Sequence, residues 1–129
     1  MKIPTLSLLK LLEDNGFGTI DKDLFFEKMP LGATGLYIAS VGMSQAKGER
    51  RRQGYDIYVR GKNDIEARKL TESVADFICN CNICELPAVP PIADESVKGV
   101  ELDLASTPTS LGLDDNGRVL FRISGTIYY

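Results

Sequence analysis

Residues 55–80 constrain the fold most strongly, because the sequence passes there from a strand pattern to a helix pattern with almost no linker. Tyr55, Ile57 and Val59 alternate along residues 55–60 with Asp56, Tyr58 and Arg60. This alternation is typical of a strand with one buried face. The sequence therefore predicts a strand at residues 55–60 that leads directly into a helix.

The helix that follows is predicted to run to about Asn80. Asn63 or Asp64 can cap its N-terminus, and Glu66 adds a favourable negative charge to the first turn. Apolar residues that recur at three- and four-residue spacing predict one buried stripe: Ile65, Leu70, Val74, Phe77 and Ile78.

A second helix and several more strands are predicted. Residues 4–14 form an amphipathic helix, in which leucines make the apolar band and Ser7, Lys10 and Asp14 the polar stripe. Strands are predicted at residues 24–29, 36–41, 83–86 and 100–105. Residues 106–113 continue as an extended arm, Asp115-Asn116-Gly117 is a turn signal, and residues 118–127 form the return strand of a hairpin.

These elements predict one domain, residues 1–129, of the α+β class. Its sheet is antiparallel or mixed, and the two main helices pack on one face. Residues 42–53 form a polar loop with a basic tip. Pro87, Pro90 and Pro91 predict an extended loop, because each proline fixes φ and removes a hydrogen-bond donor.

The two loops supply the candidate interface residues, which are Lys47, Arg50, Arg51, Arg52, Pro90, Pro91 and Ile92. The arginine run favours a contact with an acidic partner surface or with passing DNA. It is equally compatible with a solvated loop that keeps a strand edge from aggregating. Residues 44–52 and the arm at residues 88–96 are the candidates for contacts between subunits.

Composition argues against catalysis and against a membrane partner. The chain has no histidine, so the commonest general base and the commonest metal ligand are both missing. The net charge of −3 gives no general attraction to nucleic acid or to an anionic membrane. No apolar run reaches the roughly 20 residues that a membrane helix needs. We expect a protein that binds other proteins and is not an enzyme.

No motif in the sequence calls for a metal or a cofactor. Cys79, Cys81 and Cys84 provide three thiols, whereas structural zinc takes four ligands, so we expect free cysteines. A calcium loop with Gly117 at its sixth position would begin at Gly112 and end at Ile123, where acidic residues are required. A phosphate-binding glycine signature is also missing.

The closing segment resembles the tail terminator or minor capsid protein family of long-tailed bacteriophages. It reads P-x-x-L-G-x-D-x-x-G-R from Pro108 to Arg118, and a strand ending in Tyr128-Tyr129 follows. The N-terminal leucine helix, the strand 55–60 with its capped helix, and the proline-containing strand after that helix occur in the same order. The resemblance covers nearly the whole chain as an ordered pattern and implies a tail-terminator-like fold.

The resemblance implies a structural role in the virion. Members of this family form a hexameric ring that caps the finished tail tube, binding the major tail tube protein on one face and the head-completion protein on the other. DNA passes through the ring without sequence readout. We therefore expect a homo-oligomer, assembled in the host cytoplasm and located at the head-proximal end of the tail, without cofactors.

Two alternatives remain open. Another head–tail connector protein, such as a stopper or an adaptor, would share the small α/β character, but it would bind the portal side. A small ligand-binding or regulatory domain would be a monomer or dimer with a defined pocket.

Overall fold

The computed structural model describes residues 2–42, 51–81, 83–104, 106–113 and 117–129. Within these ranges the chain forms two helices and a seven-stranded mixed sheet, which is an α+β fold. The order of elements is α1 (Pro4–Asp14), β1 (Leu24–Phe26), β2 (Gly35–Val41), β3 (Arg52–Gly61), α2 (Asp64–Asn80), β4 (Ile83–Leu86), β5 (Val97–Leu104), β6 (Thr109–Leu113) and β7 (Val119–Tyr128).

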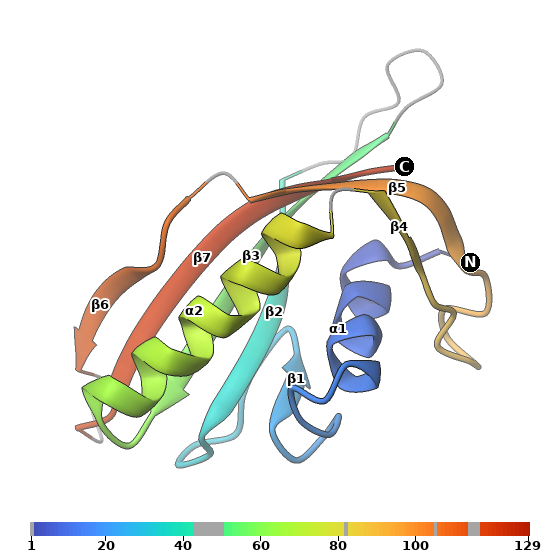
Figure 1. Ribbon diagram of the computed structural model, residues 1–129. Helices are drawn as coiled ribbons and strands as arrows, with labels where there is room; N and C mark the ends of the chain where they lie inside the picture. Colours follow the sequence, from blue (N-terminus) through green and yellow to red (C-terminus); the bar gives the residue numbers. More distant parts are fainter. Residues whose placement is uncertain (1, 43–50, 82, 105, 114–116) are drawn as a thin grey trace.

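The sheet is organised around the long antiparallel pair β3–β7. Its strand order is β1-β2-β3-β7-β5-β4, with β1 and β2 parallel and the other neighbours antiparallel. Along β7, β5 pairs with the C-terminal half and β6 with the N-terminal half, on the side away from β3. Figure 1 shows β6 running beside the start of β7, while β4 and β5 lie at the other end.

Both helices cover the same face of this sheet (Figure 1). The strand residues on that face are in register across β2, β3 and β7, as in the row Ile38, Ile57 and Ile123. All three are fully buried. The leucines of α1 and the buried stripe of α2 join them in one apolar cluster. The predicted alternation at residues 55–60 is therefore confirmed, with Tyr55, Ile57 and Val59 inside.

The packing of the Tyr55 ring against β7 requires a glycine at position 125. Tyr55 is fully buried, and its hydroxyl donates to the Asp103 carbonyl at 3.4 Å. Gly125 lies opposite Tyr55 in the ladder. A Cβ at position 125 would stand 2.1 Å from the Asp103 carbonyl oxygen and 2.4 Å from the Tyr55 hydroxyl, so only glycine leaves room for this ring.

Two helix predictions are wrong at single positions. Ile65 is 79% exposed, because it precedes the buried Val74 by nine residues and so faces the opposite way on a helix of 3.6 residues per turn. The buried stripe of α2 consists largely of small residues: Ala67, Thr71, Val74, Ala75 and Ile78. On α1, Ser7 is buried and does not belong to a polar stripe, since the first turns of α1 are enclosed on all sides.

Several strand boundaries also differ from the predictions. β1 ends at Phe26, because Glu27 takes a left-handed φ of 68° while its N–H donates to the Ile38 carbonyl. β3 begins at Arg52, so its first residues belong to the ladder and not to a loop. β5 begins at Val97, ahead of the predicted start. The arm at 106–113 contains a paired strand, β6.

Candidate protein-interaction surfaces

The sheet has two chemically different ends, which the strand register defines. At one end β2 begins, β3 ends and β7 begins, since Gly35 pairs with Arg60 and Gly61 pairs with Val119. At the other end β2 finishes at Val41, β3 begins at Arg52, and Arg52 pairs with Tyr128 near the end of β7. We call these the apolar end and the basic end for the residues that each carries.

The apolar end is defined by Leu31, Ile65 and Leu113, which are 89%, 79% and 70% exposed. Leu31 lies in the β1–β2 connection, which Arg60 holds at this end by donating to the carbonyls of Pro30 and Ala33. Ile65 lies in the first turn of α2, and Leu113 pairs with Val119. They have the highest exposed fractions among the large apolar residues that the structure describes.

The basic end carries the described part of the predicted arginine run. Lys47 and Arg50 lie outside the described residues. Arg51 and Arg52 have exposed side chains, but their backbones are fixed, because Arg51 exchanges two backbone hydrogen bonds with Tyr129 and Arg52 pairs with Tyr128. The arginines at positions 51 and 52 are therefore held by the β3–β7 ladder rather than by a loop tip.

The proline segment is a closed turn and not the predicted extended loop. Val89 and Ala93 exchange two backbone hydrogen bonds, of 2.6 and 3.0 Å, around Pro90, Pro91 and Ile92. Ala93 is fully buried, so it anchors the turn to the core, while Ile92 remains 62% exposed. The segment is therefore a turn in this structure, and Pro90, Pro91 and Ile92 are exposed on it.

The structure does bring the two predicted loops close together. Lys2, Arg51, Glu95 and Tyr129 line one surface hollow of about 490 Å³. Arg51 comes from the predicted basic loop and Glu95 from the predicted arm. Sequence reasoning treated these segments separately, and no local pattern indicated that they meet beside the chain termini.

The face of the sheet opposite the helices carries tyrosines that sequence reasoning did not assign to any site. The rings of Tyr37 and Tyr58 stack at a centroid distance of 4.8 Å with an interplanar angle of 13°. The Tyr58 hydroxyl donates to Asp56 at 3.3 Å, and the Ser124 hydroxyl bonds the same carboxylate. These side chains are half-buried by one another, so this face is polar, aromatic and ordered.

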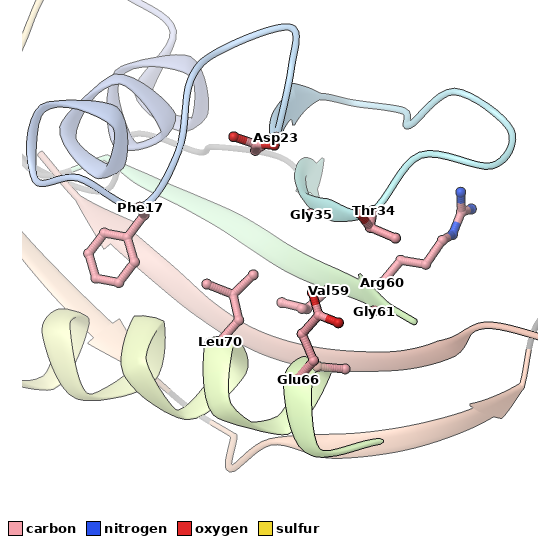
Figure 2. A pocket seen from close by; sticks show the side chains of 10 residues that line it. Phe17, Asp23, Thr34, Gly35, Val59, Arg60, Gly61, Glu66 and Leu70 are labelled. Atoms are coloured by element: carbon pink, nitrogen blue, oxygen red, sulfur yellow. The ribbon is translucent and has the colours of Figure 1, made fainter. Parts of the chain in front are cut away.

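A small pocket lies between the helix-covered face and the β1–β2 connection (Figure 2). Its volume is about 170 Å³, and it includes Phe17, Asp23, Arg60, Glu66 and Leu70 in its lining. In Figure 2 the Arg60 side chain extends away from Phe17 and Leu70. The pocket is smaller than the roughly 300 Å³ at which ligand sites usually begin, and its acidic groups have no histidine or cysteine nucleophile beside them.

The cysteines do not form a metal centre within the described residues, which contain no group of three or more side chains arranged as metal ligands. Cys79 is exposed, and Cys81 and Cys84 are partly buried. Burial raises the pKa of the Cys84 thiol to about 12, and a hydrogen bond with Cys81 adds to the rise. A thiol with such a pKa is a poor nucleophile at neutral pH.

Neither helix in the described part of the chain is long and apolar enough to cross a membrane. Comparison with models of known protein families finds no match, and comparison with curated proteins finds none. The described surfaces and the resemblance to tail terminators are therefore the grounds for a functional proposal.

Proposed function

We propose that this protein is a tail terminator. Copies form a ring that caps the completed tail tube and presents a joining surface to the head connector. The observation that carries the proposal is the difference between the two ends of the sheet, one with Leu31, Ile65 and Leu113 exposed and the other with Arg51 and Arg52 exposed. The ring size of six comes from the resemblance alone.

In a closed ring, the apolar end and the basic end of the sheet each occur once per subunit around the ring axis. Head-to-tail contacts orient all copies identically, so each face of the ring presents the same end of every subunit. Exposed apolar side chains gathered at one end can form a protein contact, and positively charged side chains can contact the phosphates of passing DNA without reading its sequence. The apolar end then meets the tail tube, while the basic end faces the connector and the DNA.

The chemistry of the interior supports a binding role over a catalytic or ligand-binding one. The pocket beside Asp23 and Glu66 is about 170 Å³ and is too small for most metabolites, and the two hollows of about 490 Å³ lie open at the surface. The chain has no histidine to act as a base. The groups that could meet another protein lie on the outside, at the two ends of the sheet.

The test is binding to each virion partner separately. The purified protein is mixed with tail tubes from the same virion and, in a parallel experiment, with the head connector, and is followed by co-sedimentation and electron microscopy. We expect rings on tube ends. Binding to the connector alone would make the protein a stopper or an adaptor, and binding to neither would overturn the proposal.

Matched variants test the assignment of the two ends. Leu31→Asp combined with Ile65→Asp should abolish tube capping and leave folding intact, because both side chains are exposed and an acidic residue suits the first turn of a helix. Arg51→Ser combined with Arg52→Ser should keep tube capping and weaken connector binding. Equal losses of both activities in both variants would contradict the assignment.

A further inference from the structure

The three cysteines lie where α2 ends and β4 begins, two elements that follow one another closely in Figure 1. Cys79 belongs to the last turn of α2, Cys81 is the C-cap of that helix, and Cys84 is the second residue of β4. All three are free thiols in this structure. Cys81 and Cys84 have the spacing C-x-x-C, and a hydrogen bond joins their side chains.

The backbone holds both members of this pair in place. The Cys81 N–H donates to the carbonyl of Ile78 at 3.1 Å, and Ile78 is fully buried. Cys84 pairs with Val100 in the β4–β5 ladder. Both cysteine side chains are partly buried and pack against the apolar core. Two sulfur atoms in hydrogen-bond contact need only small side-chain rotations to reach the S–S bond length of about 2.05 Å.

Cys79 is not placed to join this pair. Its side chain is exposed, and it lies two residues before Cys81, a spacing at which side chains on a helix do not face each other. The two remaining thiols are too few for structural zinc, which takes four ligands. The arrangement therefore favours a bond between Cys81 and Cys84 over the other pairings.

We propose that Cys81 and Cys84 are a disulfide site, which closes when a low-molecular-weight disulfide oxidises the folded chain. The thiolate of Cys81 attacks one sulfur of the small disulfide, whose S–S bond breaks, and one small thiol leaves with the proton that Cys81 lost. Cys84 then loses its proton and attacks the Cys81 sulfur, and the second small thiol leaves. The protein loses two electrons and two protons, and the small disulfide gains them as two thiols.

The surroundings of Cys84 favour a bridge that stays closed over one that passes electrons on. Enzymes that oxidise other proteins through a C-x-x-C pair depend on a thiol with a low pKa, because a stable thiolate favours the reduced form. Burial raises the pKa of Cys84 to about 12, and the hydrogen bond with Cys81 adds to the rise. Cys84 keeps its proton at neutral pH, so Cys81 attacks first, and no stable thiolate at Cys84 opposes closure.

A closed bridge ties the C-terminal end of α2 to a strand at the edge of the sheet. β4 has four residues, and within the described chain β5 is its one neighbouring strand. The inference does not depend on the proposed function, but the two combine. A reducing cytoplasm would keep the pair as thiols during assembly, and an oxidising medium outside the cell would close it.

The test counts thiols in the full chain. Wild type and variants are equilibrated with oxidised and reduced glutathione, quenched with acid, unfolded, alkylated and measured by mass spectrometry. After oxidation, wild type should keep one thiol, at Cys79, that takes up the alkyl group or glutathione. Cys79→Ser, the matched control, should take up neither. Cys79→Ser combined with Cys84→Ser has a single thiol, which should take up one or the other.

A comparison with the unfolded chain separates the effect of the fold from the effect of the spacing. Because the fold brings the two thiols together, the bridge in Cys79→Ser should form at about tenfold less oxidised glutathione in buffer than in concentrated urea. By linkage, the bridge should raise the equilibrium constant for folding by the same factor, so the urea midpoint of the oxidised protein should be higher.

Alkylation of both thiols in oxidised Cys79→Ser, a bridge that joins two chains, or closure at the same glutathione concentration in buffer and in urea would overturn the inference. So would a wild-type bridge that includes Cys79. The wild-type count tests the inference even where a variant fails to fold, because three modified thiols after oxidation would also contradict it.

Discussion

Tyr55 and Tyr58 lie on the same strand but on opposite faces of the sheet, and their surroundings differ. Tyr55 is fully buried on the helix-covered face, above Gly125, and its hydroxyl reaches one backbone carbonyl. Tyr58 lies on the open face, half-buried, stacked on Tyr37 and bonded to Asp56. We therefore expect side chains on the covered face to contribute more to stability than side chains on the open face.

Truncation of the two tyrosines should give the largest difference between the faces. Tyr55→Ala should lower the free energy of unfolding by about 3–5 kcal/mol, because it leaves a large cavity in the core. Tyr58→Ala should cost about 1 kcal/mol, the typical value of an exposed aromatic pair. Urea denaturation of both variants measures the difference, and equal costs would remove the distinction between the faces.

Neighbouring residues of β7 offer a second comparison across the sheet. Gly125→Ala should cost about 3 kcal/mol, since the new methyl group would overlap the Asp103 carbonyl and the Tyr55 hydroxyl. Ser124→Ala, on the open face, removes the hydrogen bond that the Ser124 hydroxyl donates to Asp56 and should cost about 1 kcal/mol. If the thermal unfolding curve of Gly125→Ala matches that of wild type, the close packing of Gly125 against Asp103 and Tyr55 is contradicted.

The covered face should also control stability at alkaline pH. Burial raises the pKa of Tyr55 above its usual value near 10. Between the two pKa values the unfolded chain loses a proton that the folded chain keeps, so the stabilisation is complete below about pH 10 and is lost as the pH rises above it. The raised pKa of Cys84 acts in the same direction from about pH 9 upward.

The measurement is the free energy of unfolding as a function of pH for wild type and for Tyr55→Phe. The phenylalanine variant should show a flatter decline above pH 10, because it has no hydroxyl to ionise. Cys84→Ala should flatten the decline above pH 9, whereas Cys79→Ala, at an exposed site, serves as its control. Parallel slopes in wild type and Tyr55→Phe would show that Tyr55 ionises equally in both states.

The smallest effect on stability is expected at the basic end, outside both faces. Replacing Arg50, Arg51 and Arg52 with serine should change the free energy of unfolding by less than about 0.5 kcal/mol, since surface changes are usually neutral. The same variant should impair head–tail joining in a complementation assay. Unchanged particle yield would remove the arginines from the functional proposal.

Local patterns predicted much of the fold because they depend on residues close together in the chain. The alternation at residues 55–60, the Asn63 cap that accepts from the Glu66 N–H at 2.8 Å, and Pro4 at the start of α1 all occur as the sequence indicates. The candidate surfaces were less predictable. The arginine run marked the basic end, but no local pattern indicated that Leu31, Ile65 and Leu113 are exposed at the same end of the sheet.

By itself the sequence determined which residues form the two helices and which face of each central strand is buried, because periodicity is a property of a short segment. Only the tertiary structure decided that β3 pairs with β7, about half the chain away, and that β6 pairs with β7 alone among the described strands. It also decided that Ile65 is exposed while Ala67 is buried against the sheet. These outcomes depend on how closely segments that are distant in the chain can approach one another. Gly61 and Gly125 permit such an approach, because a Cβ at either position would overlap a neighbouring segment.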